Sequence, residues 1–409
     1  MQPGAEVELT IGDVAFGGDG VSRTSDGCVV FVPSTTIGDS VRAEVVSSHR
    51  HFSRAVVREL LTPGPGRCEP ACPFYGRCGG CRYQHIDHAT QVELKKGQLL
   101  ELLRRVGRLG SVPDVDPIVP CPTPFGYRNR LRLQAFRPTA GDDRLEYGFC
   151  ELDNETLFPV DKCPLASAEV NAVLAPAQRS NWARKNTTRP HPFDLSVRRD
   201  STGRTVFFFG RAPRAFTWLT ESVLGNPVRV PAGGFWQTNP AVAESLFKTV
   251  SEWFSAAPTP YLIDAYSGVG ALSLAVGGAA KRRWLIERDP GAAEAASHNH
   301  TELGISSVTS MHGATEKVLP GLMSQLGERL TETTLLLDPP RSGCAGRLVE
   351  GLAASSFARI LYVSCNPATL ARDLGKMVSE DGYRLRRLAL FDMFPQTAHF
   401  EVAALLERS

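Results

Sequence analysis

The residue whose type and position most directly suggest covalent chemistry is Cys365. It ends the apolar run RILYVSC, and Asn366-Pro367 follows at once, an N-cap and a first-turn proline that predict the start of a helix. A thiol beside a helix N-terminus is favoured as thiolate, the nucleophilic form. The alternative is a packing residue, the usual role of a lone cysteine. The sequence therefore indicates a candidate nucleophile at a strand end.

An earlier loop has the composition of a small-molecule site. DAYSGVG (264–270) follows a strand-like run, and Glu287 ends the next run, where a carboxylate can accept hydrogen bonds from ribose hydroxyls. Ser273 replaces the third glycine of the dinucleotide fingerprint, and Asp264 leads the loop. This pattern favours a cationic ligand such as S-adenosylmethionine (SAM). An ordinary strand-to-helix turn is the alternative.

Two further carboxylates follow strands or open them. Asp338 leads Asp-Pro-Pro-Arg, where methyltransferases acting on amino groups usually have an aromatic residue after the prolines. Arg341 at that position disfavours amino methylation and leaves Asp338 as a polar contact in the pocket. Glu401 opens the last strand-like run, FEVAALLE, and can act as a general base if it faces the pocket. A glutamate on an edge strand is otherwise solvated.

A cluster of cysteines has the spacing of metal ligands. Cys72, Cys78 and Cys81 lie close together, with two glycines between the last pair, and Cys163 follows much later. Disulfides are not expected in a chain without an export signal. The spacing suits either a four-thiolate zinc site or an iron–sulfur cluster.

The elements that must position these residues form an alternating pattern from about residue 239. Strand-like runs at 261–266, 283–288, 333–338 and 359–365 alternate with helical segments. This pattern predicts an α/β doubly wound sheet, whose ligands bind at the carboxyl ends of the strands. Asn239 is the expected N-cap of the first helix, with a stripe formed by Val242, Leu246, Val250 and Trp253.

The first part of the chain has a different pattern. Short β-branched runs separated by turn signals in residues 1–62 predict a small OB-like barrel. A helix is expected near 91–108, and residues 117–235 indicate strands and loops. We therefore expect three domains, at 1–62, 63–235 and 236–409. The stripe expected on the helix near 91–108 consists of Leu99, Leu102, Val106 and Leu109.

Composition limits the class of protein without identifying a partner. The 409 residues are 42% hydrophobic and 22% charged, with a formal charge of +2, as in an ordinary globular protein. The sequence has no apolar run of membrane-spanning length and no secretory signal, so we expect a cytoplasmic protein, and a monomer is the simplest assumption. Local basic stretches suggest phosphate contacts by Arg128, Arg130, Arg132, Arg184, Lys185, Arg189, Arg198 and Arg199.

Six motifs together resemble the SAM-dependent uridine-C5 RNA methyltransferases, which form 5-methyluridine in 23S ribosomal RNA and transfer RNA. They are FWQTN (235–239), DAYSGVG (264–270), IERD (286–289), DPPRSG (338–343), SCNPATLARD (364–373) and MFPQTAHFE (393–401). Residues 1–62 are similar to the TRAM domain, an RNA-binding barrel. The resemblance covers nearly the whole chain.

The resemblance implies a class I SAM-dependent methyltransferase domain, a TRAM barrel and a central α+β domain with a cysteine-bound cluster. It implies Cys365 as the nucleophile and Glu401 as the base that removes the C5 proton. It matches the four spaced cysteines to a [4Fe-4S] cluster, with zinc as the alternative. Ala314 stands where an Asp or Asn often contacts adenine. The SAM contacts that it implies are Gln237, Asp264, Tyr266, Gly268, Gly270, Glu287 and Asp338.

The partner implied is RNA, with ribosomal RNA expected and transfer RNA the alternative. A cytosine-C5 enzyme would also use a cysteine that attacks C6, but it would place that cysteine in a different loop. A non-catalytic iron–sulfur or zinc RNA-binding protein is the third reading. It has no need of Cys365, Glu401 and Asp264 together.

Overall fold

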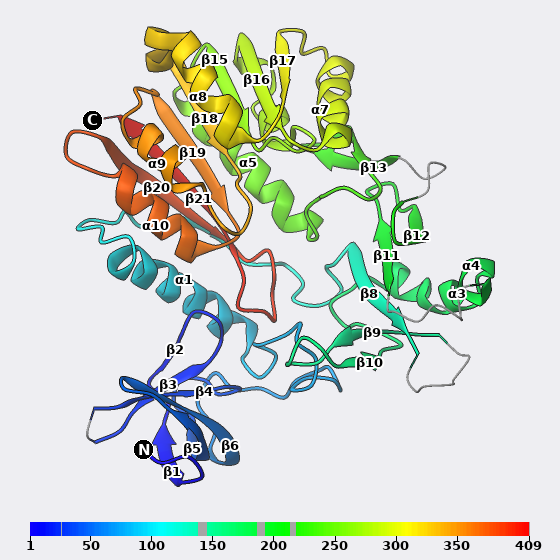
Figure 1. The fold of residues 1–409 in the computed structure, drawn as a ribbon, viewed down its shortest axis with the longest axis vertical. Coiled ribbons are helices and arrows are strands. Elements are labelled where there is room, and N and C mark those ends of the chain that lie inside the picture. Colours follow the sequence, from blue (N-terminus) through cyan, green and yellow to red (C-terminus); the bar gives the residue numbers. More distant parts are fainter. Residues whose placement is uncertain (26, 138–144, 186–192, 213–217, 409) are drawn as a thin grey trace.

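The structure, a computed structural model, describes residues 1–408 except 26, 138–144, 186–192 and 213–217. The described strands form sheets of six, five and eight strands and a two-stranded hairpin. Figure 1 shows the six-stranded sheet at the bottom of an elongated molecule, the eight-stranded sheet at the top and the five-stranded sheet beside the region between them.

The six-stranded sheet is the small barrel that the sequence predicts at the N-terminus. Its order is β1-β5-β6-β4-β3-β2. Every second residue of β5 points inward, so that Val41, Ala43 and Val45 are buried while their neighbours are partly exposed. The strands are β1 (Glu6–Thr10), β2 (Asp13–Val14), β3 (Gly20–Arg23), β4 (Val29–Val32), β5 (Ser40–Ser48) and β6 (Phe52–Thr62).

The eight-stranded sheet confirms the predicted α/β pattern. Its order is β17-β16-β15-β18-β19-β21-β20-β7. The first five strands in that order are parallel, whereas β21 runs antiparallel to both β19 and β20. The strands are β15 (Tyr261–Ala265), β16 (Arg282–Glu287), β17 (Val308–His312), β18 (Thr333–Leu337), β19 (Arg359–Ser364), β20 (Tyr383–Phe391), β21 (Glu401–Arg408) and β7 (Val115–Val119).

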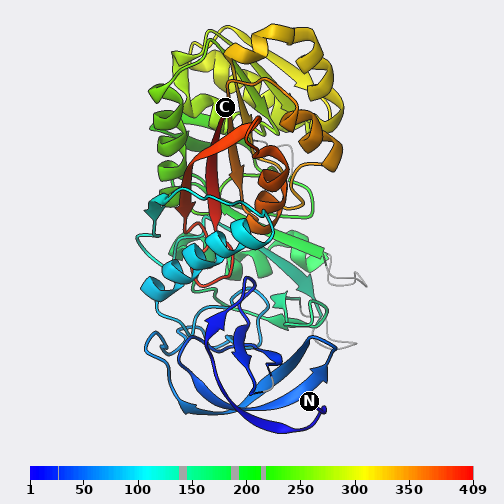
Figure 2. The same ribbon diagram turned by 90° about the vertical axis from the view of Figure 1, so that its left-hand side faces the viewer.

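Helices cover both faces of this sheet, which is why its strands are apolar throughout. In β18, Leu335 and Leu337 pack with one face and Leu336 with the other. Helices α1, α8, α9 and α10 cover the first face, and α5, α6 and α7 the second (Figures 1 and 2). The helices are α1 (His88–Arg105), α5 (Pro240–Ala256), α6 (Ala271–Ala275), α7 (Pro290–Glu302), α8 (Thr315–Leu326), α9 (Gly346–Ala353) and α10 (Pro367–Met377).

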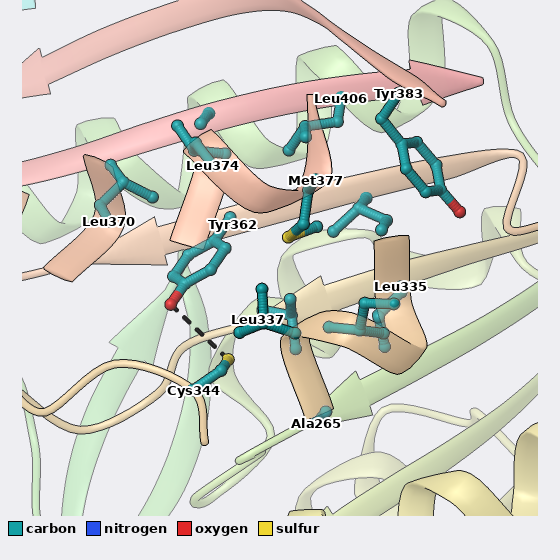
Figure 3. Close-up of a cluster of buried hydrophobic side chains, with 14 of the residues drawn as sticks. Ala265, Leu335, Leu337, Cys344, Tyr362, Leu370, Leu374, Met377, Tyr383 and Leu406 are labelled. Carbon is teal, nitrogen blue, oxygen red and sulfur yellow. Dashed lines mark hydrogen bonds between the residues drawn. The ribbon is translucent and has the colours of Figure 1, made fainter. Parts of the chain in front are cut away.

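The first face contains the apolar cluster that supports the end of β19. Leu370, Leu374 and Met377 of α10 lie over this face, as the sequence predicted, and the Tyr362 hydroxyl points toward Cys344 (Figure 3). The Tyr362 hydroxyl also donates to Asp373 at 2.7 Å, so that the buried phenol is satisfied. This packing anchors α10, whose first turn follows Cys365 directly.

The segment predicted to belong to the central domain also contributes to this large sheet. Strand β7 adds to its edge, and α1 packs beside α10. Elsewhere in 63–235, the described residues include a five-stranded sheet, a hairpin and short helices. These elements are β8 (Arg130–Phe136), β9 (Glu146–Cys150), β10 (Leu157–Pro159), β11 (Phe193–Arg199), β12 (Thr205–Phe209), β13 (Trp218–Val223), β14 (Asn226–Pro231), α2 (Ala168–Ala172), α3 (Leu174–Gln178) and α4 (Asn181–Lys185).

The buried face of α1 differs from the predicted leucine stripe. Leu99 is buried, but Val106 lies beyond the helix end and is 46% exposed. Three polar side chains, Gln91, Lys95 and Gln98, are buried on the face that packs inward. Apolar periodicity misses these positions because a buried polar residue needs a partner from elsewhere in the fold, which no local pattern reveals.

Lys95 connects α1 to the segment that follows β20. Its ammonium group lies 2.6 Å from Asp392, which also accepts from His88 at 2.7 Å, and both Lys95 and Asp392 are fully buried. Burial acts to raise the pKa of Asp392, but the hydrogen bonds from His88 and Lys95 hold that pKa below its usual range. The ion pair therefore fixes α1 to the large sheet.

No described helix is both long enough and apolar enough to cross a membrane.

We expect Lys95→Met to lower the free energy of unfolding by about 3–5 kcal/mol, because it leaves the buried carboxylate of Asp392 without its main counter-charge. Lys96→Met is the matched control, since Lys96 is only half-buried. Its expected effect is within about 0.5 kcal/mol. Guanidinium unfolding of the two variants measures the difference, and equal losses would contradict a specific role for the ion pair.

Candidate active site and cysteine cluster

Cys365 and Glu401 lie opposite each other on neighbouring strands. Ser364 of β19 pairs with Val402 of β21, so the next residues outward, Cys365 and Glu401, come directly opposite at the carboxyl edge of the parallel strands. Directly opposed residues of an antiparallel pair share one face of the sheet. Cys365 is half-buried and Glu401 is 4% exposed. The fold therefore brings the candidate nucleophile and the candidate base together.

The charges around Cys365 act against its ionisation. Burial, together with the neighbouring carboxyl groups of Glu401 and Asp338, raises the pKa of the Cys365 thiol to about 11, while Arg341 opposes this shift by charge and by a hydrogen bond. The sequence-based expectation of a lowered thiol pKa is therefore wrong. Position beside a helix N-terminus is outweighed by desolvation and by two acidic neighbours.

Glu401 is a buried carboxyl group with unused hydrogen-bonding capacity. Its Oε2 atom is buried and has no hydrogen-bond partner among the described residues. Burial and the nearby Asp338 raise the pKa of Glu401 well above its usual value. The alternative of a solvated edge-strand glutamate is excluded, because β21 lies between β19 and β20. A buried oxygen without a partner is available to a group that enters the site.

The glycine loop after β15 is held by two carboxylates. Asp264 is buried and accepts a hydrogen bond from the Ser273 backbone at 3.1 Å, whereas Glu287 accepts from the Gly268 backbone at 2.9 Å. Gly270 has φ +85°, and a Cβ there would come within 2.7 Å of the His300 ring, so that only glycine fits. Beside Gly268, in contrast, the space is open, since no atom lies within 4 Å of a Cβ built there.

This end of the sheet has an excess of buried acid. Burial raises the pKa of Asp264 to about 8, and the nearby Asp338 and Glu287 add to the shift. Burial likewise raises the pKa of Asp338. Such a group of carboxyl groups is stabilised by a cation, since a positive charge restores their ionised forms. The arrangement therefore fits a cationic ligand beside the glycine loop.

Residues 235–239 approach this edge from the central part of the chain. Gln237 is 7% exposed, and its backbone carbonyl accepts from the Asn129 side chain at 3.1 Å. Asn239 caps α5, as predicted, and donates to the carbonyl of Met393 at 3.2 Å. Phe235 is 71% exposed, the most exposed large apolar side chain described. The segment thus places a buried amide and an exposed aromatic ring near residues 392–400.

His399 and Arg341 also lie at the site, although the sequence analysis assigns neither of them a role in the reaction. His399 is half-buried and faces Arg341, Lys95 and Arg128. Burial, reinforced by these three cations, lowers the pKa of His399 to about 4, so the imidazole is neutral at pH 7. Arg341 is the cation that interacts with both Cys365 and Glu401. The only sequence signal was their place within DPPRSG and MFPQTAHFE.

The four spaced cysteines line one small cavity. Cys72, Cys78, Cys81 and Cys163 surround it together with aromatic and aliphatic side chains. Burial raises the pKa of the Cys81 thiol to about 12, and nearby Cys163 and Cys78 contribute to the shift. Within the described ranges, no three His, Cys, Asp or Glu side chains are already arranged to hold a metal ion. The fold therefore gathers four thiols without presenting a finished ligand set.

The basic residues are largely engaged within the protein. Arg198 is 2% exposed and donates to the carbonyls of Pro231, Ala232 and Gly234, so the expectation that it contacts phosphate is wrong. Arg130 also donates to the Gly234 carbonyl. These contacts support the turn before Phe235. Arg132 forms an ion pair with Asp194, and Arg199 forms one with Glu169. Arg128 donates a hydrogen bond to the Tyr127 hydroxyl.

A partner within the protein does not test whether a basic side chain also contacts phosphate. The exposed Arg132 therefore stays a candidate, as do the other predicted contacts apart from the buried Arg198. Lys185 is exposed at the end of α4, so it stays a candidate. Arg189 and the side chain of Arg184 lie outside the described residues.

Comparison with known families matches two parts of the chain. Residues 227–409 match the family described as tRNA (Uracil-5-)-methyltransferase, and residues 1–57 match the TRAM domain. The first match contains the glycine loop, Cys365 and Glu401, and the second contains most of the barrel.

Similar proteins extend over the full length. An uncharacterised RNA methyltransferase of Nostoc sp. is 30% identical, covering 98% of this chain and 96% of its own. One of Clostridium acetobutylicum is 27% identical, covering 98% and 97%. The crystal structure of Pyrococcus abyssi tRNA (uracil-54, C5)-methyltransferase with S-adenosyl-L-homocysteine has a TM-score of 0.71 at 23% identity, covering 98% of this chain and 99% of its own.

We expect alkylation of Cys365 by iodoacetamide to accelerate about tenfold for each pH unit from 7 to 10, because only the thiolate reacts and its pKa is about 11. Asp338→Asn should lower the pKa of the Cys365 thiol by removing a negative neighbour. Arg341→Met should raise that pKa by removing a positive one. Mass spectrometry of the Cys365 peptide measures the rates. An alkylation rate that stops rising by about pH 8 would show that the pKa of the Cys365 thiol is not raised.

Proposed function

Because this chain belongs to the family of SAM-dependent RNA methyltransferases that act on uracil C5, we propose that it methylates C5 of a uridine in structured RNA through a covalent bond between Cys365 and uracil C6. The proposal is carried by the register of β19 and β21, in which Cys365 directly follows Ser364 and Glu401 directly precedes its partner Val402, and by the interaction between the charges of Cys365 and Glu401. Uracil C5 is a poor nucleophile, so the reaction needs a thiolate, a base and a methyl donor at one ring.

Cys365 begins the proposed reaction as a thiolate that adds to C6. The ring becomes an enolate with its negative charge on O4, and C5 becomes nucleophilic. SAM, when bound, supplies an electrophilic methyl group and a positive charge. Asp264 and Asp338 would lie near that charge if they hold the donor, and a positive charge there would favour the ionised forms of these acids. C5 takes the methyl group as the carbon–sulfur bond to the donor breaks.

Glu401 completes the proposed reaction as the general base. C5 now carries both a methyl group and a hydrogen, and the carboxylate removes that hydrogen as a proton. The electron pair re-forms the C5–C6 double bond and expels the Cys365 sulfur. A carboxyl group whose pKa is raised by burial is a stronger base than a solvated one, which suits the removal of a proton from carbon.

The remaining residues are proposed to orient the donor and the base. The buried amide of Gln237 and the carboxyl group of Glu287 suit the polar groups of SAM, and Ala314, the N-cap residue of α8, leaves adenine to backbone contacts. The exposed ring of Phe235 suits stacking on a base, since a stacked uridine must leave the helix to react. The proposed SAM contacts are Gln237, Asp264, Tyr266, Gly268, Gly270, Glu287 and Asp338.

The cysteine cluster is proposed to hold a [4Fe-4S] cluster, with zinc as the alternative. Four thiols at one cavity supply the complete ligand number of either site. A bound cluster would join the segment 72–81 to Cys163 and so shape the central sheet. No step of the methyl transfer requires it.

The proposed partner is RNA in the cytoplasm, bound by a monomer. The sequence-based expectation is 23S ribosomal RNA, whereas the family description and the Pyrococcus structure carry the name of transfer RNA and favour that alternative. Both substrates use the same chemistry. Methylation of 23S and transfer RNA transcripts, followed by mapping of 5-methyluridine, separates them.

RNA with 5-fluorouridine at the target is expected to form an adduct with the protein that survives denaturing electrophoresis, because fluorine cannot leave C5 as a proton does. Cys365→Ala should abolish the adduct and turnover while SAM still binds, whereas Glu401→Gln should trap a methylated adduct with ordinary RNA. Cys28→Ala is the control, since Cys28 directly precedes β4 of the barrel and does not belong to the sheet that carries Cys365. Free migration of the wild-type protein, where ordinary RNA is methylated, would reject the covalent route.

Protein purified without oxygen is expected to be brown and to contain about four irons per chain. Cys163→Ser should lose most of the iron, whereas Cys150→Ser should keep it, because Cys150 does not line the cavity. Iron and zinc analysis with absorption spectroscopy measures both. A colourless protein with one zinc per chain would replace the iron–sulfur proposal with the zinc alternative.

A further inference from the structure

The segment 392–400 joins β20 to β21 and leads directly into Glu401. Every residue of the segment is buried or half-buried. Because Glu401 is the first residue of β21, the path of this segment helps to set where its carboxyl group lies relative to Cys365. Whatever fixes the segment therefore affects the geometry of the proposed base.

Gln396 lies in the middle of this segment in an unfavourable backbone conformation. Its φ is +68°, in the left-handed region, which costs a non-glycine residue roughly 1 kcal/mol or more. Its polar groups are held from two directions. The backbone N–H donates to Gln91 Oε1 at 2.9 Å, and the backbone carbonyl accepts from Arg82 at 3.1 Å and from Tyr83 at 3.0 Å.

The side chains of Gln91 and Gln396 complete the contact. Gln91 Nε2 donates to Gln396 Oε1 at 3.0 Å, so Gln91 uses both ends of its amide on one residue. The same Nε2 atom lies within hydrogen-bond distance of the carbonyls of Tyr83 and Ile86. Gln91 is fully buried and Gln396 is 4% exposed. We call these two residues the glutamine pair.

Other contacts hold the segment without replacing this pair. Lys95 donates to the Phe394 carbonyl at 3.2 Å, and the Tyr127 hydroxyl donates to the Pro395 carbonyl at 3.1 Å. These bonds lie on the β20 side of Gln396. The part of the segment between Gln396 and Glu401 contains His399, which interacts with the cations of the site. This part is also held by the Thr397 hydroxyl, which donates to the Phe394 carbonyl at 2.8 Å, and by the buried ring of Phe400. Loss of the glutamine pair should therefore shift the Glu401 side of the segment while the chain stays folded.

We propose that Gln91 is a positioning residue for Glu401: by fixing Gln396 it holds the base where it can remove the C5 proton. This inference rests on the proposed function of Glu401. Gln91 does not act on the substrate itself. The earlier steps depend on Cys365, at the end of β19, and on the glycine loop after β15, neither of which belongs to segment 392–400. A shifted segment should therefore slow release of the product more than transfer of the methyl group.

The test compares the rate of methyl transfer with the rate at which Cys365 is eliminated from the product in the Gln91→Ala variant. With ordinary RNA and SAM we expect single-turnover methyl transfer to stay within about twofold of wild type, while kcat falls about tenfold, equivalent to about 1.4 kcal/mol. A methylated protein–RNA adduct that survives denaturation should then accumulate. A folding defect alone would lower the rates of methyl transfer and of elimination together, so that no adduct would accumulate.

Gln98→Ala is the matched control. Gln98 lies on the same buried face of α1, but its amide donates to the carbonyls of Val14 and Ala15 in the barrel and to the Tyr83 hydroxyl. It makes no described hydrogen bond to segment 392–400. We expect a comparable loss of stability in thermal unfolding, a higher KM for RNA and no accumulated adduct.

Gln396→Gly tests the same contact if Gln91→Ala does not fold. Glycine accepts the positive φ and keeps the backbone bonds, but it removes the bond to Gln91 Nε2. Adduct accumulation in the same direction supports the inference. Equal adduct in Gln98→Ala, or none in either glutamine-pair variant, overturns it. If the wild-type protein forms no adduct with 5-fluorouridine RNA, the proposed function fails instead, and the two failures are distinguishable.

Discussion

The antiparallel insertion of β21 beside β19 is the constraint on which the site depends. In a sheet of parallel strands alone, every carboxyl end lies at one edge and every amino end at the other. Because β21 runs the other way, its first residue arrives at the edge where β15, β18 and β19 end. That single reversal brings a carboxyl group from the chain's last strand opposite Cys365 and beside Asp338. The two faces of the sheet are covered by helices, so this edge is where polar side chains converge.

The pKa values at the site are explained by the burial of several carboxyl groups beside few positively charged side chains. Asp264, Asp338 and Glu401 all have raised pKa values, and burial together with Glu401 and Asp338 raises the pKa of the Cys365 thiol. Arg341 is the cation that faces both Cys365 and Glu401. In the proposed reaction, the positive charge of the methyl donor would therefore favour the ionised forms of these groups, including the Cys365 thiolate. The protonation states of these groups and the binding of the donor would thus depend on each other.

Segments far apart in the chain meet at residues 392–400. Helix α1 supplies Lys95 and Gln91, and the residues just after Cys81 donate two backbone N–H groups to Gln396. Phe16 of the barrel packs edge-on against Phe400, with ring centroids 6.2 Å apart. The barrel, the cysteine segment and α1 therefore all contact the polypeptide that carries Glu401. Their polar contacts are buried, which makes each one costly to lose and gives the segment a single arrangement.

The sequence alone determined the residue types and the local elements: a cysteine and an asparagine cap at the end of β19, a glycine loop after β15, and apolar stripes such as Leu370, Leu374 and Met377. These are local properties, because strand and helix periodicity and capping extend over only a few residues. The tertiary structure decided that β21 is a central strand, that the Cys365 pKa is raised, and that Gln91 and Lys95 are buried with partners about 300 residues away. No periodicity encodes such partners, because burial of a polar group becomes favourable only when the completed fold supplies its hydrogen bonds.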